Sequence, residues 1–179
     1  MARTHTGQET IRLSYIKSHY ESEYLQLINV ASTAPSKLQN IQIGMEEGLL
    51  IKVILKLLNP ITIIEIGTLV GYSTVWLVKS LAQSNKARVI SIDCNQAHYE
   101  TAKKNLNSLG LQDKVELVYG KALEVLPVVA QKYLKNQELD AMFIDAQKNE
   151  YEQYLDFAEK YLRSGGVIIA DNTLLFDEM

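Results

Sequence analysis

The chain has 179 residues, of which 47% are hydrophobic and 22% charged, with a formal net charge of −3. We expect one globular domain over residues 11–179, preceded by a loose polar arm over residues 1–10. The acidic balance gives no reason to expect nucleic acid as a partner, and the single cysteine, Cys94, excludes an internal disulfide. No apolar run reaches the roughly 20 residues of a membrane span, and no secretory signal pattern is visible, so we expect a cytoplasmic protein.

Two helices are predicted before the first strand. Apolar and aromatic residues recur at helical spacing over residues 11–30, which indicates an amphipathic helix outside the sheet. Its tyrosine-rich face either closes over the domain or meets a second subunit. The sequence Ala34-Pro35-Ser36 breaks the chain, and apolar pairs over residues 49–58 predict a second helix that ends at Asn59-Pro60.

The stretch over residues 61–73 organises the rest of the chain. Its unbroken isoleucine run predicts a strand that is covered on both faces, followed by a turn with Gly67 and Gly71 and a helix over residues 72–82. Glycine lets the backbone approach a ligand closely, and a helix N-terminus attracts an anionic group. Glu65, just before the turn, can accept hydrogen bonds from hydroxyls or a cationic amine. A ligand with both an ammonium and a carboxylate group suits this loop.

The remainder alternates between strands and helices. Further strands are predicted over residues 87–93, 114–119, 139–145 and 167–170, the last after a turn at Ser164-Gly165-Gly166. The helices between them cover residues 95–109, closed by Gly110, and residues 121–135; a third has Tyr151, Tyr154, Leu155, Ala158 and Leu162 on one face. This alternation predicts an α/β fold, a doubly wound parallel sheet with strand order 3-2-1-4-5. Ligands of such sheets bind beyond the carboxyl ends of the strands.

Asp93 stands at the end of the second predicted strand, 26 residues after Gly67. Nucleotide-binding sheets place a carboxylate for the ribose hydroxyls at this position, which favours a ligand that contains adenosine. The turn lacks the G-x-G-x-x-G pattern that a pyrophosphate requires, which argues against a dinucleotide and leaves S-adenosylmethionine. The alternative is an exposed acid at a strand end.

Three oxygen donors follow the fourth and fifth predicted strands. Asp145 and the pair Asp171-Asn172 end on neighbouring strands, and two carboxylates with an amide suit a hard divalent cation such as Mg²⁺. Lys148 follows Asp145 by three residues, so its amine can turn back toward the metal ion. The positive charge of the ion should lower the pKa of the Lys148 amine, which suits a general base. The alternatives are that Asp145 is a solvated strand end, that Asp171-Asn172 opens a turn and that Lys148 is a surface lysine.

Several segments together resemble the cation-dependent O-methyltransferases, the caffeoyl-CoA and catechol O-methyltransferase group, over residues 38–175. The segments are Glu65-Ile66-Gly67-Thr68 with Gly71-Tyr72-Ser73, Phe143-Ile144-Asp145-Ala146-Gln147-Lys148, and Gly165-Gly166 with Asp171-Asn172-Thr173-Leu174. The resemblance implies a class I, Rossmann-like methyltransferase that uses S-adenosylmethionine and a divalent cation, Mg²⁺ or another such as Mn²⁺ or Ca²⁺.

The resemblance also assigns roles to residues. Glu65 and Asp93 would hold the ribose and methionine ends of the cofactor, with Gly67, Thr68 and Ser73 around its amino-acid portion. Ile43 matches a backbone contact, Ala122 the adenine-side contact, and Asp145 a residue beside the cofactor. Asp145, Asp171 and Asn172 match the metal ligands, and Lys148 matches the catalytic lysine.

The implied function is O-methylation of a small vicinal diphenol by a homodimer. The family continues past residue 179 with a helix and two strands, so we expect the fifth strand to present an apolar edge unless another chain covers it. Gln147 replaces an acid of the plant-type members, so an acyl-CoA acceptor is not implied. The alternatives are a non-catalytic or truncated S-adenosylmethionine-binding, dimer-forming protein, an NAD dehydrogenase and a nucleic-acid methyltransferase.

Overall fold

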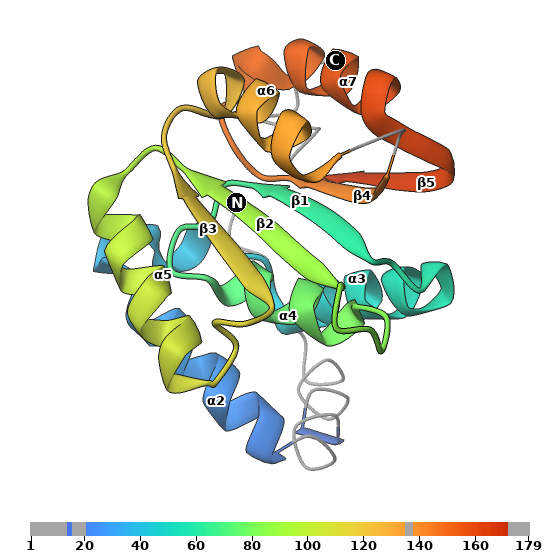
Figure 1. The fold of residues 1–179 in the computed structure, drawn as a ribbon. Coiled ribbons are helices and arrows are strands. Elements are labelled where there is room, and N and C mark those ends of the chain that lie inside the picture. Colours follow the sequence, from blue (N-terminus) through green and yellow to red (C-terminus); the bar gives the residue numbers. More distant parts are fainter. Residues whose placement is uncertain (1–13, 16–20, 135–137, 172–179) are drawn as a thin grey trace, which may run out of the picture.

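The centre of the fold is a five-stranded parallel sheet in the order β3-β2-β1-β4-β5. A computed structural model describes residues 14–15, 21–134 and 138–171 (Figure 1). Its strands are β1 (Thr62–Ile66), β2 (Arg88–Asp93), β3 (Val115–Tyr119), β4 (Leu139–Ile144) and β5 (Leu162–Ala170). The predicted α/β class and strand order are therefore confirmed.

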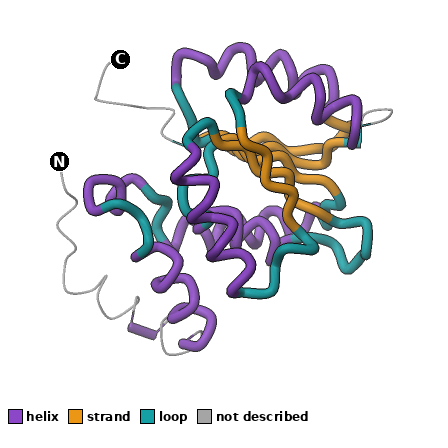
Figure 2. The backbone as a smooth tube through the Cα atoms, turned by 60° about the vertical axis from the view of Figure 1, so that its left-hand side comes forward, coloured by secondary structure: helices purple, strands orange, loops and turns teal. Residues whose placement is uncertain are grey.

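Helices cover both faces of the sheet. They are α2 (Glu21–Ser32), α3 (Met45–Leu58), α4 (Tyr72–Ser80), α5 (Gln96–Ser108), α6 (Ala122–Tyr133) and α7 (Tyr151–Tyr161), with short 3₁₀ helices η1 (Ser36–Ile41) and η2 (Lys148–Glu150). Helices α6 and α7 lie over one face, and α3, α4 and α5 over the other, so the sheet is the middle layer (Figures 1 and 2). The helix predicted over residues 11–30 overlaps α2; residues 11–13 and 16–20 of that prediction lie outside the described residues.

The isoleucine run of β1 serves two cores because successive side chains of a strand point to opposite faces. Ile63 packs in a core with Leu55 and Trp76, on the side of α3 and α4. Ile64 and Ile66 belong to a second core on the side of α6 and α7. Every residue of β1 is buried, as predicted for a strand covered on both faces.

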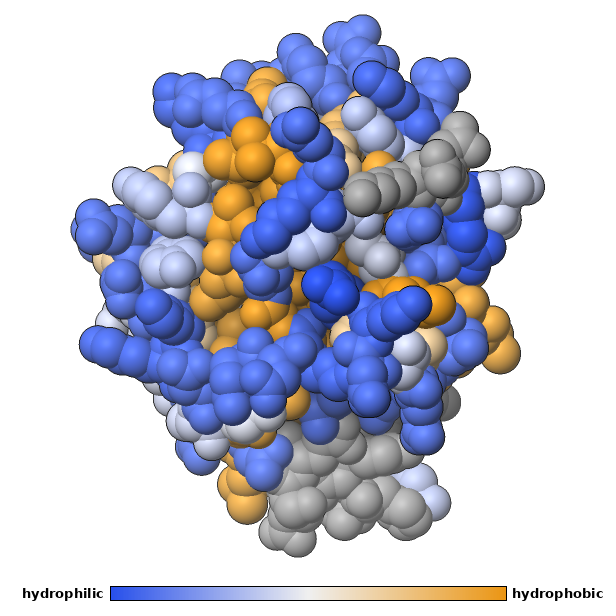
Figure 3. All heavy atoms as spheres, viewed as in Figure 1, coloured by the Kyte–Doolittle hydropathy of each residue, from blue (hydrophilic) through white to orange (hydrophobic). Residues whose placement is uncertain are grey.

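The two edges of the sheet are less covered. Side chains of β3 are half-buried except that of Tyr119, which is exposed, and apolar surface lies along this edge between α5 and α6 (Figure 3). Within the described part of the chain β5 is the other edge, and its residues are half-buried or exposed. Among the helices of the described residues, we find none with the length and apolar character that a membrane crossing requires.

The structure corrects the prediction at the junction of α7 and β5. Leu162, predicted on a helix face, has extended backbone and opens β5. The predicted turn at residues 164–166 instead lies within β5, where the pairing register shifts opposite Leu139 and Ala141 and Gly165 has a φ of +75°. Leu139 faces Leu162 and Ala141 faces Val167, so β5 has three more residues than β4 between these pairs. Such an irregularity absorbs extra residues without ending the strand, and glycine tolerates the backbone angle.

Asp140 joins three strands at the end of the sheet opposite their carboxyl ends. Its Oδ2 accepts hydrogen bonds from the backbone amides of Ile61 and Thr62, both at 2.8 Å. Its Oδ1 accepts one from Arg163 Nε at 2.5 Å. The side chain therefore links the starts of β1, β4 and β5.

We expect Asp140→Ala to lower the free energy of unfolding by about 3 kcal/mol, because two amides at the start of β1 lose their acceptor. Urea denaturation measures the loss. Arg163→Ala is the control, since Arg163 is 37% exposed and its removal should cost less than about 1 kcal/mol. Equal losses in the two variants would show that the ion pair, and not the amide bonds, matters.

Candidate functional site

A cleft of about 1320 Å³ opens at the carboxyl ends of the strands. Predicted site residues that line it are Ile43, Gly67, Thr68, Ser73, Asp93, Ala122, Asp145, Lys148 and Asp171. Glu65 is not among the described residues that line the cleft, and Asn172, the third predicted metal ligand, lies outside the described residues. The volume exceeds the roughly 300–1,000 Å³ of a typical single-ligand pocket, so the cleft has room for a cofactor and an acceptor.

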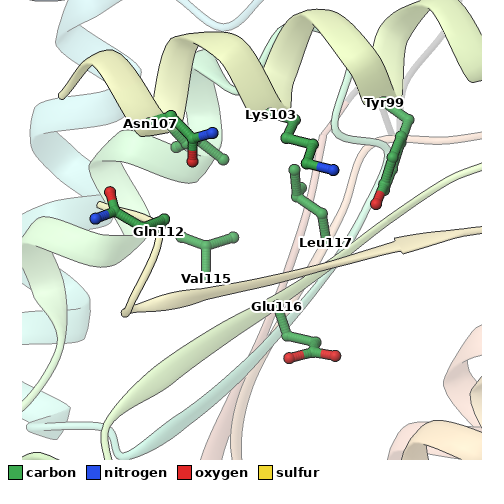
Figure 4. A pocket seen from close by; sticks show the side chains of 8 residues that line it. Tyr99, Lys103, Asn107, Gln112, Val115, Glu116 and Leu117 are labelled. Carbon is green, nitrogen blue, oxygen red and sulfur yellow. The ribbon is translucent and has the colours of Figure 1, made fainter. Parts of the chain in front are cut away.

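A smaller hollow of about 240 Å³ lies between α5 and β3 (Figure 4). Tyr99 and Lys103 of α5 and Leu117 of β3 line it, whereas Glu116 points to the other side of the strand and pairs with Lys132 at 3.2 Å. It contains none of the predicted site residues. The cleft at the strand ends is therefore the candidate site.

Gly67 brings the ends of β1 and β4 together. It has a φ of +98°, and a Cβ atom there would lie 2.0 Å from the backbone oxygen of Asp145. Side chains rarely adopt this backbone angle, and no Cβ fits at that distance. We predicted close approach to a ligand at this glycine; the structure shows close approach to the residue that follows β4. As a result, Asp145 stands directly beside the glycine loop.

Glu65 lies behind the cleft wall and is completely buried. Its Oε1 accepts a hydrogen bond from Ser73, and its Oε2 accepts bonds from Thr74 and Ser91, all at 2.5 Å. The Ser91 hydroxyl lies 2.6 Å from that of Thr68. Glu65 thus holds two residues of the cleft wall, Ser73 directly and Thr68 through Ser91.

Burial raises the pKa of Glu65 to about 7. The hydrogen bonds from Ser73, Ser91 and Thr74 act in the opposite direction, and the negative charge of Asp145 adds a further upward contribution to this pKa. The carboxyl group is therefore poised to change its protonation state near neutral pH.

Asp93 fixes the glycine loop to the end of β2. Its Oδ2 accepts hydrogen bonds from the amides of Thr68 at 3.2 Å and Leu69 at 2.8 Å, and its Oδ1 accepts one from Asn95 at 2.8 Å. His98 Nδ1 lies 3.5 Å from Oδ1. A carboxylate offers about four acceptor positions and the three amides use three of them, so one position at the cleft wall is left for His98 or for a ligand hydroxyl.

The ends of β4 and β5 lie side by side, as predicted. The Asp171 amide donates to the Ile144 carbonyl at 2.9 Å. Lys148 Nζ lies 3.6 Å from Asp145 Oδ1 and donates to the Asp171 carbonyl at 3.1 Å. Burial raises the pKa of Asp145, the negative charge of Asp171 adds to the increase, and Lys148 opposes it. Among the described residues, no three His, Cys, Asp or Glu side chains form a metal-binding group.

Tyr151 is a residue of this site to which sequence reasoning gave no functional role. Its hydroxyl accepts a hydrogen bond from Lys148 Nζ at 2.7 Å and donates to the Asp171 carbonyl at 2.9 Å. The available signal was its spacing of three residues from Lys148, which places two side chains together on a helical turn. Tyr151 also fits the spacing of the apolar face of α7. The pattern alone therefore did not distinguish packing on that face from a contact with Lys148.

Comparison with known proteins matches residues 16–179 to the O-methyltransferase family model. The chain belongs to the O-methyltransferase family. A catechol O-methyltransferase of Niastella koreensis is 32% identical over 87% of this chain and 68% of its own length. A catechol O-methyltransferase of Mycobacterium tuberculosis is 32% identical over 81% of this chain and 63% of its own length. The chain therefore spans about two thirds of these relatives.

Solved structures agree with this assignment. An O-methyltransferase from Bacillus cereus in complex with S-adenosylhomocysteine (SAH) has a TM-score of 0.72 and 30% identity, covering 88% of this chain and 70% of that one. The O-methyltransferase TomG from Streptomyces achromogenes, in complex with S-adenosylmethionine, has a TM-score of 0.70 and 28% identity, covering 82% and 66%. The resemblance to the cation-dependent O-methyltransferases is confirmed, and the neighbours support a cofactor of this type for this family member.

Stability of this O-methyltransferase family member should fall as the pH rises from about 5 to 8. The folded protein keeps the Glu65 proton up to a pKa of about 7, whereas the unfolded chain releases it near the ordinary value of 4.5. Between these values the unfolded state binds fewer protons, so the free energy of unfolding decreases, by about 3 kcal/mol in total.

Urea denaturation at several pH values tests this in wild type and Glu65→Gln. The variant has no proton to release and should lose most of the slope, whereas Glu159→Gln, an exposed change on α7, should keep it. An unchanged slope in Glu65→Gln would contradict the assignment of the proton to Glu65.

Proposed function

We propose that this protein transfers a methyl group from S-adenosylmethionine to one hydroxyl of a small vicinal diphenol, with the help of a divalent cation. The observation that carries the proposal is the convergence of Asp145, Asp171 and Lys148 at adjacent strand ends beside the glycine loop. Membership of the O-methyltransferase family and the catechol O-methyltransferase names of the relatives support it.

The cleft wall suits the proposed cofactor. Gly67, Thr68 and Ser73 would surround its amino-acid portion, and Ile43 would supply a backbone contact. Asp93 would accept hydrogen bonds from the ribose hydroxyls, and Ala122 would contact the adenine. Glu65 would act from behind by holding Ser73 and Thr68 in place. The carboxylates of Glu47, Asp93 and Asp145 line the cleft, and their negative charge favours a ligand that carries a positive sulfonium group.

Asp145, Asp171 and Asn172 are the proposed ligands of Mg²⁺, or of Mn²⁺ or Ca²⁺. The first two fit because the negative charge of Asp171 raises the pKa of Asp145, a repulsion that a cation would relieve. Such a cation would lower the pKa of two adjacent hydroxyl groups of the substrate.

Lys148 is the proposed general base. It accepts the proton of one acceptor hydroxyl, and the resulting oxygen attacks the methyl carbon in line with the sulfonium. The carbon–oxygen bond forms as the carbon–sulfur bond breaks. The electron pair of the carbon–sulfur bond goes to the sulfur atom, giving S-adenosylhomocysteine. The residues of the cleft contribute by alignment, because this displacement needs no enzyme nucleophile.

Asp145→Asn should lower methylation of catechol at least about 100-fold, because loss of one carboxylate removes a proposed metal ligand. Production of SAH from S-adenosylmethionine and catechol is measured with EDTA and with added Mg²⁺ or Mn²⁺. Wild type should be inactive in EDTA and recover with the cation, while Asp156→Asn, an exposed acid on α7, should behave like wild type.

Full wild-type activity in EDTA would contradict the metal requirement. Tight binding of S-adenosylmethionine by calorimetry, without turnover of any diphenol, would instead favour a non-catalytic binding protein.

We also propose that the protein forms a homodimer, supported by an exposed apolar stripe on α3. Leu50, Val53 and Leu57 are 61%, 57% and 85% exposed and lie on one side of the helix. Sedimentation should give twice the monomer mass of 20.2 kDa, and Leu57→Asp should shift the protein toward monomer because a charge is costly in an apolar contact. A wild-type monomer at micromolar concentration would contradict this proposal.

A further inference from the structure

We propose that Tyr151 is a positioning residue that aims the Lys148 amine at the acceptor hydroxyl. The inference rests on the proposed function, in which Lys148 is the general base. It goes further because it assigns the orientation of that base to a second side chain and to one backbone carbonyl.

The local fold places the two side chains together. Lys148 is the first residue of η2, and the amide of Tyr151 donates to the Lys148 carbonyl, closing a 3₁₀ turn. Side chains three residues apart eclipse on such a turn. Lys148 Nζ accordingly lies 2.7 Å from Tyr151 Oη and 4.9 Å from the centre of the tyrosine ring. This contact follows from the turn itself.

The hydroxyl of Tyr151 is in turn held by the sheet. It donates to the Asp171 carbonyl at 2.9 Å, with the Ile144 carbonyl farther away at 3.3 Å. These carbonyls stand at the ends of β5 and β4, next to the acids proposed as metal ligands. Since the single hydroxyl proton points toward a carbonyl, the hydroxyl oxygen presents its lone pairs to the lysine.

These contacts fix the direction of the lysine amine. Besides its bond to carbon, the amine nitrogen has three directions. Two are taken by Tyr151 Oη at 2.7 Å and the Asp171 carbonyl at 3.1 Å. The third faces Asp145 Oδ1, which lies 3.6 Å from Nζ and forms an ion pair with it. Since Asp145 is a proposed metal ligand, this third direction faces the proposed place of the acceptor hydroxyl, and the amine is aligned before the acceptor arrives.

Tyr151→Phe removes the hydroxyl and keeps the ring, and Tyr161→Phe is a matched change at the end of α7, outside the residues that line the cleft. We expect Tyr151→Phe to lower kcat about tenfold, because the base is misaligned. The KM for catechol and the Kd for S-adenosylmethionine should change less than about twofold, since the hydroxyl does not hold either ligand in this proposal. Tyr161→Phe should match wild type in all three.

A double-mutant cycle separates positioning from general support of the fold. If Tyr151 acts through the lysine, Tyr151→Phe should have no further effect on kcat in a Lys148→Ala background. The same tenfold loss in both backgrounds would overturn the inference and leave the proposed function intact. An unchanged kcat in Lys148→Ala would show that Lys148 is not the base. An absence of wild-type turnover would contradict the proposed function. Either result would also overturn the inference.

A crystal structure of Tyr151→Phe gives a test that does not depend on activity. The Lys148 amine should leave hydrogen-bond distance of the Asp171 carbonyl or occupy more than one position. An amine that stays in its wild-type place would overturn the inference, whereas Tyr161→Phe should leave that place unchanged.

Discussion

The contact between the ends of β1 and β4 is the constraint on which the site depends. With glycine at position 67, the loop after β1 runs directly against the backbone of Asp145. Any larger residue would push the two strand ends apart. This one contact brings the part of the wall proposed for the cofactor next to the acids proposed for the metal. Transfer of a group between two bound molecules needs such closeness, because the reacting atoms must approach to about 3–3.5 Å.

Two kinds of interaction hold the wall around this contact. Backbone amides of Thr68 and Leu69 bind the Asp93 carboxylate, which fixes the loop to β2. Hydroxyl groups around Glu65 fix the first turn of α4 to β1 and β2. Side chains that bind the loop from behind leave its front surface for ligands.

The sequence predicted those parts of the fold that depend on local patterns. The unbroken isoleucine run of β1 is typical of a strand covered on both faces, and the acids follow directly after such apolar runs. The strand order follows from the alternation of strands and helices. The pattern did not reveal the irregularity at Gly165, because a Gly-Gly pair is equally typical of a turn and of a break in strand pairing. Leu162 was misplaced for the same reason, since an apolar residue at that spacing fits both a helix face and a strand.

The candidate site shows a similar division. The closeness of Asp145, Lys148 and Asp171 was predictable because a parallel sheet brings the residues after its strands to one edge. The burial of Glu65 behind the cleft wall was not predicted, because the alternation of a strand decides only which face a side chain takes. Its hydroxyl partners, Ser73, Thr74 and Ser91, come from two other elements. Sequence reasoning gave Tyr151 no role because its spacing fits the packing face of α7 as well as a contact with Lys148.

The partners of Glu65 are all hydroxyl groups, and this choice has a mechanical consequence. A hydroxyl exchanges the roles of donor and acceptor by rotating about a single bond, without moving its oxygen. When the carboxyl gains or loses a proton, Ser73, Thr74 and Ser91 can reorient their hydrogens while the heavy atoms stay where they are. Lysine or amide partners would have to shift instead. The positions of the loop atoms therefore do not depend on whether the buried acid carries a charge.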